Sequence, residues 1–164
     1  MAIDAYLQIA DIKGESNDEK HKGWIEVRNV DWSVNQPRAT SISTAGGHTN
    51  AKADLSVVSF DKLADLASPI LFQHCAMGKT IPKAVFEFYR ADGEGKPICY
   101  FKLELENVMI SKFHPNSGNG GTLAETVHLA YARIKSTYTQ QKIGGGAGGS
   151  TMGGWDASAN KVHA

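Results

Sequence analysis

The sequence predicts a mainly β fold, built as one small antiparallel β-barrel or sandwich with a single short helix. Apolar and polar residues alternate with a period of two in several segments, which is typical of half-buried strands. Only one segment carries clear start and stop signals of a helix. The length of 164 residues suits one domain of ordinary size.

The first strands follow from this alternation. Residues 3–9 place Ala5, Leu7 and Ile9 on one side, so we expect a strand there. Within residues 24–35 the apolar side changes, from odd-numbered positions at the start to even-numbered positions from residue 30 on. Because one extra residue reverses the alternation, this change predicts a bulge near Arg28 and Asn29. Residues 54–60 resume extended character.

The predicted helix covers residues from about 69 to 77. Ser68 is the expected N-cap, Pro69 suits the first helical position, and Gly78 followed by Lys79 supplies the stop. Apolar residues cover much of its circumference, which is consistent with a short helix pressed against a sheet edge.

A hairpin and a last strand complete the predicted sheet. Residues 84–90 and 98–105 read as strands on either side of a glycine-punctuated turn at 91–97. The second arm continues through residues 108–113 after a bend at Asn107. A final strand is expected over 125–138.

Two segments lack the composition of a core element. Residues 36–51 are rich in Gly, Ser and Thr and predict a long loop, which makes them a candidate contact surface. From residue 140 the glycine tract predicts a flexible coil, in which Trp155 suggests a docking point. The predicted organisation is therefore a β-barrel domain at 1–139 and a Gly-rich flexible tail at 140–164.

Charge and composition exclude several classes of protein. Lys and Arg number 17, as do Asp and Glu, so the net charge of zero argues against binding to a nucleic-acid backbone. The chain has no apolar run long enough to span a membrane, and its first residues do not read as a secretory signal. We therefore expect synthesis to end in the cytoplasm, and the two cysteines to be free thiols.

The residues show no catalytic or cofactor constellation. The six histidines lack the short spacings of metal ligands, and the glycine tract lacks the lysine of a phosphate-binding loop. We expect no metal, no cofactor and no enzymatic activity. Two alternatives stay open at this point: a monomeric β-barrel that binds a small ligand or peptide, and, ranked last, a hydrolase that uses His74 or Cys75.

Several segments in order along nearly the whole chain resemble the Hcp family, the haemolysin-coregulated tube proteins of type VI secretion. The segments that carry the resemblance are Asp4-Ala5-Tyr6-Leu7, Ile12-Lys13-Gly14-Glu15-Ser16, His21, Trp24-Ile25-Glu26-Val27, Trp32-Ser33-Val34 with Gln36, Ala67-Ser68-Pro69-Ile70-Leu71-Phe72, Gly78-Lys79 with Pro82, Arg90, Tyr138-Thr139 and Gly154-Trp155-Asp156. The lengthened glycine-rich stretch before Trp155 departs from the family pattern.

This resemblance implies a phage tail-tube-like barrel with a side helix, which forms homohexameric rings that stack into a hollow tube. The implied partners are other copies of the chain, the sheath, spike and baseplate proteins of the secretion machine, and small secreted effectors held in the lumen. The implied subunit has no chemical step of its own. It is cytoplasmic before firing and then secreted without a signal peptide.

Ring formation suggests roles for two groups of residues. If Val30, Trp32 and Val34 face the core, then Asn29, Asp31 and Ser33 face the other way and are candidates to line the lumen. The long 36–51 segment is the candidate for contact between stacked rings. Its candidate residues are Gln36, Arg38, Thr40, Gly46, Gly47 and His48.

Overall fold

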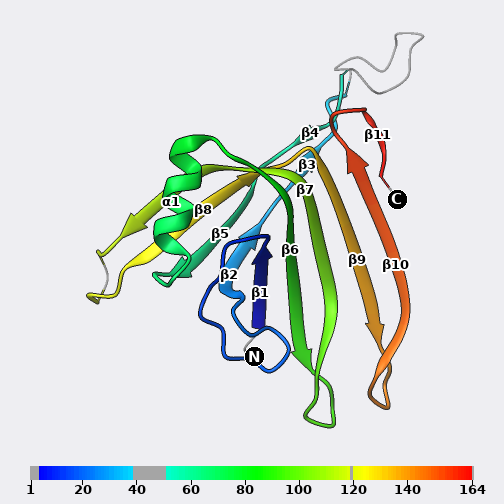
Figure 1. The fold of residues 1–164 in the computed structure, drawn as a ribbon. Coiled ribbons are helices and arrows are strands. Elements are labelled where there is room, and N and C mark those ends of the chain that lie inside the picture. The colour runs from blue at the N-terminus through cyan, green and yellow to red at the C-terminus, as the bar shows by residue number, and fades with distance from the viewer. Residues whose placement is uncertain (1–3, 39–50, 119, 164) are drawn as a thin grey trace, which may run out of the picture.

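Six antiparallel strands close into a barrel in the computed structural model, which describes residues 4–38, 51–118 and 120–163 (Figure 1). Around the barrel, each strand pairs with the next, and the last strand pairs back onto the first. In order, the strands are β7 (Pro97–Asn116), β6 (Thr80–Ala91), β1 (Asp4–Ile9), β2 (Ile25–Asp31), β5 (Val58–Leu63) and β8 (Ala124–Ala130). The predicted mainly β barrel with one short helix is confirmed.

The long strand β7 belongs both to the barrel and to an extension of the sheet. Its residues 109–116 pair with β8, whereas residues 101–106 pair with β9 (Arg133–Gln141). Strand β10 (Ala147–Asp156) pairs with β9, and the short β11 (Lys161–Val162) pairs with the end of β10. A separate two-stranded ladder joins β3 (Val34–Asn35) to β4 (Asp54–Leu55).

The barrel interior is filled by apolar side chains from alternate positions of its strands. Phe60 and Phe86 are fully buried and meet edge to face, with ring centroids 5.6 Å apart. Burial of each such side chain contributes about 1.5–3 kcal/mol, so this core stabilises the barrel without disulfides. Other fully buried members are Leu7, Ile9, Ile25, Val58, Leu103, Leu105, Val127 and Leu129.

Helix α1 (Ser68–Met77) lies where the sequence predicts it, and only its N-terminal cap differs. Gly78 ends the helix with a φ of 64°, and its N–H donates to the carbonyl of Cys75. Ser68 is not the N-cap as predicted, because Ala67 occupies that position without a side-chain hydrogen bond. The Ser68 hydroxyl instead donates to the buried carboxylate of Glu125, 2.5 Å away.

Two predicted irregularities are present, and one predicted strand is split. The register of β2 shifts between Arg28 and Asp31, and Asn29 has a φ of 52°, so the bulge is confirmed. Asn107 also has a φ of 52° and bends β7. The chain predicted to be one strand over 125–138 forms β8 and β9 instead, because its break at 131–132 lies opposite this bend.

The glycine-rich segment forms a strand in the same sheet, where the sequence predicts a flexible tail. Residues 150–156 of β10 pair in regular register with 133–139 of β9. At Gly154, an added Cβ would lie 2.5 Å from the carbonyl oxygen of His163 and 2.6 Å from that of Ile134. Glycine is therefore required here for close backbone approach. The composition was misleading because ladder hydrogen bonds need no side chain.

Candidate functional site: a polar face across four strands

One outer face of the barrel carries a continuous set of polar side chains. It spans β2, β5, β8 and the 109–116 half of β7, whose intervening side chains, such as Phe60 and Val127, are buried in the core. Because successive residues of a strand point to opposite sides, the polar residues between them point outward. We call this surface the polar face: Asn29, Asp31, Ser59, Asp61, Lys112, His114, Thr126 and His128.

Strand register aligns these side chains in two rows. In one row, Ser59 pairs with Asp31 on β2 and with His128 on β8, which in turn pairs with Lys112. In the other row, Asp61 pairs with Thr126, and Thr126 pairs with His114. Side chains directly opposite each other on adjacent strands are close neighbours, so each row presents donors and acceptors side by side.

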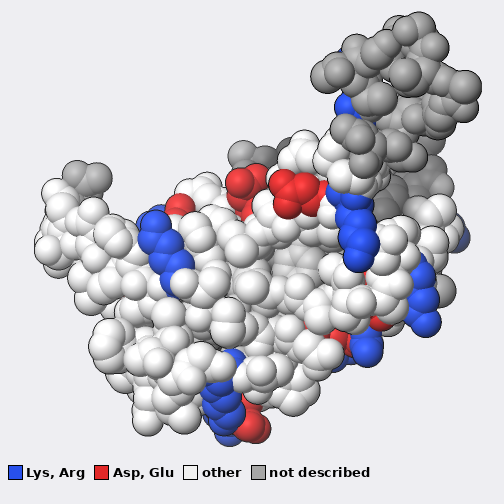
Figure 2. Space-filling view, turned by 90° about the horizontal axis from the view of Figure 1, so that it is seen from above, with Lys and Arg blue, Asp and Glu red and all other residues white. Residues whose placement is uncertain are grey.

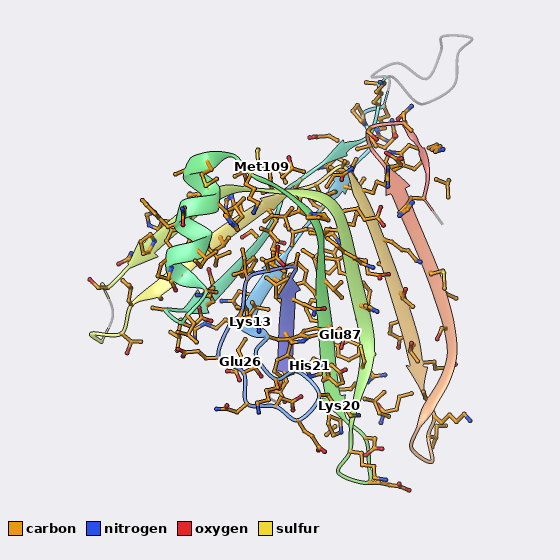
Figure 3. All side chains as sticks on the ribbon, viewed as in Figure 1. Lys13, Lys20, His21, Glu26, Glu87 and Met109 are labelled. Atoms are coloured by element: carbon orange, nitrogen blue, oxygen red, sulfur yellow. The ribbon has the colours of Figure 1, made fainter. Side chains whose placement is uncertain are left out.

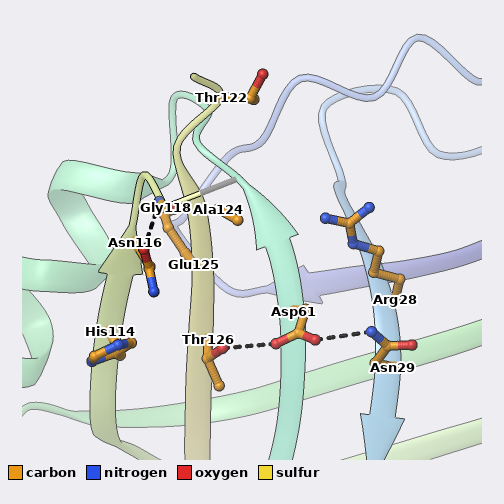
Figure 4. Close-up of a pocket in the computed structure, with 10 residues that line it drawn as sticks. All are labelled: Arg28, Asn29, Asp61, His114, Asn116, Gly118, Thr122, Ala124, Glu125 and Thr126. Atoms are coloured by element: carbon orange, nitrogen blue, oxygen red, sulfur yellow. Dashed lines mark hydrogen bonds between the residues drawn. The ribbon is translucent and has the colours of Figure 1, made fainter. Parts of the chain in front are cut away.

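Asp61 organises the centre of the second row. The amide of Asn29 donates to one carboxylate oxygen at 2.9 Å, and the hydroxyl of Thr126 donates to the other at 2.8 Å (Figure 4). The bulge in β2 brings Asn29 into reach of this carboxylate. A hollow of about 490 Å³ lies over the same residues, with Arg28, His114 and Asn116 also on its wall.

The chemistry of this face is hydrogen bonding and charge pairing. Asp31 and Asp61 are accompanied by Lys112 within the face and by Arg28 on the wall of the adjoining hollow, so the surface has mixed charge. Among the residues that the structure describes, no group of three or more His, Cys, Asp or Glu side chains is placed to hold a metal ion. The arrangement suits contact with a polar macromolecular surface.

The structure separates the three predicted lumen candidates. Asn29 and Asp31 are exposed on the polar face. Ser33 lies beyond the end of β2, where its backbone N–H donates to the hydroxyl of Ser56 at 2.8 Å.

Of the predicted stacking residues, Gln36 and Arg38 are exposed, and the Gln36 amide donates to the carbonyl of Ala51 at 2.8 Å. The remaining four, Thr40, Gly46, Gly47 and His48, lie outside the described residues.

Sequence reasoning did not single out most of the polar face. The alternation within 125–138 already puts Thr126 and His128 on the side away from the core, and the same pattern in 58–63 exposes Ser59 and Asp61. This signal was present in each strand separately. What the sequence could not supply is the pairing order that places β2, β5, β8 and β7 side by side.

A second polar arrangement, around His21, holds the 11–24 loop on the sheet. The buried His21 ring lies 2.6 Å from a carboxylate oxygen of Asp18 through Nδ1 and 2.8 Å from one of Glu87 through Nε2 (Figure 3). It stacks on Tyr6 with centroids 4.4 Å apart. Tyr89 donates a hydrogen bond to Glu87. Burial is the main cause that raises the pKa of Tyr89, and the carboxylate of Glu87 raises it further. Both ring nitrogens are engaged, so this cluster has a structural role.

The fold and the polar face define a small antiparallel β-barrel protein with one side helix, whose interior is filled mainly by apolar side chains and whose polar face lies on the outside. Within the described ranges, no helix has the length and apolarity needed to cross a bilayer, since α1 has ten residues.

Comparison with known proteins identifies the family. The family model described as "Type VI secretion system effector, Hcp" matches residues 6–138. Protein hcp1 of Pseudomonas aeruginosa is 33% identical over 163 residues, which cover 98% of each chain. The chain belongs to the Hcp family of the type VI secretion system.

Solved structures agree with this assignment. The crystal structure of Hcp1 from Salmonella typhimurium matches with a TM-score of 0.79 and 33% identity, over 99% of this chain and 100% of that one. A structure described as a type six secretion system protein matches with a TM-score of 0.90 and 28% identity, over 99% and 100% of the two chains.

Proposed function

We propose that this chain is a structural subunit of the type VI secretion inner tube. Homohexameric rings stack into the tube, which is expelled when the sheath contracts, and the lumen carries or protects small secreted effectors. The sheath, spike and baseplate proteins are its other partners. The subunit is cytoplasmic before firing and is then secreted without a signal peptide. Membership of the Hcp family supports this role.

The observation that carries the proposal is the polar face on the outside of a barrel whose interior is filled. The face extends over four adjacent strands, and Asp31 on β2 and Lys112 and His114 on β7 are its exposed charged or titratable side chains at the two ends. A channel that holds polar proteins without trapping them needs such a wall, which offers hydrogen bonds but no apolar patch. We therefore assign this face to the lumen, and residues 36–51 to the contact between stacked rings.

Strand β10 supports association between subunits. Along Ala147–Gly153, its only pairing partner within the described part of the chain is β9, so its other edge is open. This segment contains no charged residue and no proline. Because proteins usually protect exposed edges with such residues, an unprotected edge indicates that a neighbouring molecule covers it.

The two competing functions fit the structure less well. A ligand-binding monomer needs a cavity within the barrel, but Phe60, Phe86 and Leu103 are fully buried side chains that fill that space. A hydrolase that uses His74 or Cys75 needs a second reactive group beside that side chain, and these two residues do not supply it for each other. They are adjacent on α1, and successive helical residues point about 100° apart.

The mass in solution tests this function. We expect light scattering on a size-exclusion column to give six times the subunit mass, and negative-stain images to show rings. A monomer at every accessible concentration, with binding of a small ligand, would instead favour the ligand-binding barrel.

A label on the polar face tests its assignment to the lumen. In a background with Cys75→Ser and Cys99→Ser, we expect a gold-maleimide label on Asp31→Cys to appear on the ring axis in electron micrographs. Glu94→Cys is the matched control, because Glu94 is an exposed acid in the β6–β7 turn, away from the polar face. Label from Asp31→Cys at the outer rim would contradict the assignment.

A further inference from the structure

Two histidines lie on the polar face, one in each of its rows. His114 on β7 is exposed and lies on the wall of the 490 Å³ hollow, and His128 on β8 is partly buried. In the described part of the chain, the histidines with a carboxylate within 4.0 Å of the ring are His21 and His163. Histidine is the side chain whose charge ordinarily changes between about pH 5 and 8, so the charge of the polar face depends on pH in that range.

The groups that face His128 carry one positive and one negative charge. Lys112 lies directly opposite it on β7, and Ser59 lies opposite it on β5, with Asp31 of β2 next in the row. With a neutral His128 the charges of this row cancel. Protonation of His128 leaves the row with one excess positive charge.

The groups that face His114 are balanced in the same way. Arg28 and Asp61 line the hollow with it, and their opposite charges cancel. Glu125 also borders the hollow, but its carboxylate is paired with Lys62 at 2.7 Å. At neutral pH the attraction of an anion to Arg28 is therefore offset by Asp61, and protonation of His114 shifts the balance in favour of the anion.

The surroundings add little further charge. Helix α1, which packs against β7, contains no Asp, Glu, Lys or Arg, and His74 and Cys75 are its titratable side chains. Among the described residues seen from above, acidic and basic side chains form small groups among uncharged ones (Figure 2). A gain of two positive charges on the polar face is therefore large compared with its charge at neutral pH.

The hollow also has the size and the donors to hold a carboxylate. Its volume of about 490 Å³ is that of a small-ligand site. The Asn116 carbonyl oxygen accepts from the backbone N–H of Gly118 at 2.7 Å, so the NH₂ group of Asn116 is the part that can donate to a ligand. A protonated histidine donates through both ring nitrogens, and its hydrogen bonds to a carboxylate are charge-assisted.

We propose that the hollow binds carboxylate side chains of an effector, and that protonation of His114 and His128 strengthens this binding in mild acid. This inference rests on the proposed tube function and names a class of cargo: proteins with acidic segments, which the lumen holds more tightly as the pH falls. In a homohexameric ring the added charge is repeated in every subunit, so the potential of the whole channel changes sign together.

Binding of an acidic peptide at two pH values tests the proposal. The probe is a rhodamine-labelled aspartate peptide, which stays ionised at both values because aspartate has an ordinary pKa of about 3.9. At low salt, we expect fluorescence anisotropy to give a Kd at least about tenfold lower at about pH 5.5 than at about pH 8. A lysine peptide is expected to change in the opposite direction. Equal affinity of the aspartate peptide at both pH values overturns the proposal.

Three variants assign the effect to the polar face. In the His114→Asn, His128→Asn double variant we expect the affinity to change less than about twofold between the two pH values. In the His114→Lys, His128→Lys double variant the positive charge is permanent, so the peptide should bind tightly at both. His163→Asn is the matched control, because His163 pairs with the end of β10, outside the polar face, and should keep the wild-type behaviour.

Light scattering on the same samples separates this proposal from the tube function. Rings whose pH dependence survives in the asparagine double variant overturn the proposal and leave the tube function standing. Loss of the pH dependence in His163→Asn also overturns it, because the effect then comes from overall charge. A monomer that shows the pH dependence supports the carboxylate site and overturns the tube function. If circular dichroism shows the asparagine double variant unfolded, the lysine double variant decides, and a wild-type pH dependence there overturns the proposal.

Discussion

Replacement of Lys62 by Met is expected to lower the free energy of unfolding by about 3–5 kcal/mol. The Lys62 side chain is fully buried, and its Nζ lies 2.7 Å from a carboxylate oxygen of Glu125 and 2.8 Å from one of Asp65. It also donates to the hydroxyl of Ser68 at 3.1 Å and to the carbonyl of Leu63 at 3.0 Å.

The cost arises from the partners that remain. The Glu125 side chain is fully buried, and its second carboxylate oxygen has no hydrogen-bond partner within the structure. Without the ammonium group, this carboxylate must stay charged in an apolar setting or take up a proton, and both are unfavourable. The same cluster connects β5, β8 and the start of α1, so its loss also loosens the helix.

Urea unfolding at a fixed protein concentration measures this effect. Lys83→Met is the matched control, because Lys83 also meets a carboxylate, Glu104, at 3.0 Å, but its side chain is 50% exposed. We expect that control to cost less than about 1 kcal/mol. In the Lys62→Met, Glu125→Leu double variant, most of the stability should return. A cost below about 1 kcal/mol for Lys62→Met itself would show that the buried charges are not paired as described.

The sequence predicted the elements whose signals are local. Gly78 marks the end of α1, the turn at 91–97 marks the β6–β7 hairpin, and the change of alternation at Asn29 marks the bulge. Each of these depends on a few neighbouring residues. The predicted Ser68 cap is wrong because the helix begins one residue earlier, with Ala67 as its N-cap, and the Ser68 hydroxyl instead accepts from Asp65 N–H and Lys62 and donates to the distant Glu125.

Elements that depend on distant pairing were not predictable in the same way. Residues 147–156 were predicted to be a coil because glycine is depleted in strands. This propensity is only a weak prior, and pairing with the β9 backbone overrides it. For the polar face, Asn29 and Asp31 were predicted because they lie within β2, whose change of alternation is visible in the sequence. Asp61 and His114 were not singled out, since only the barrel order brings their strands alongside β2 and β8.

Replacement of His21 by Phe is expected to lower the free energy of unfolding by about 2–4 kcal/mol at neutral pH. Phe keeps the stack on Tyr6 but removes the bonds at 2.6 Å to Asp18 and 2.8 Å to Glu87. Glu87 then keeps its hydrogen bond from the Tyr89 hydroxyl, whereas Asp18 loses its hydrogen bond from His21. His163→Phe is the matched control, because the His163 ring is 3.8 Å from a carboxylate oxygen of Glu106 and should cost less than about 1 kcal/mol.

Acid should remove part of this difference. The hydrogen bond from His21 is the main cause that lowers the pKa of Asp18 below its ordinary value of 3.8, and the backbone N–H of Lys20 lowers it further. A group with a lowered folded-state pKa stabilises the fold above its unfolded pKa, and this contribution disappears as pH falls through the folded value. In His21→Phe the Asp18 pKa returns toward normal, so less stability remains to be lost. The free energies of unfolding of the two proteins, measured in urea, should therefore converge as the pH falls below about 4. A difference that stays constant down to about pH 2 would show that Phe acts through packing around Tyr6 and not through the Asp18 hydrogen bond.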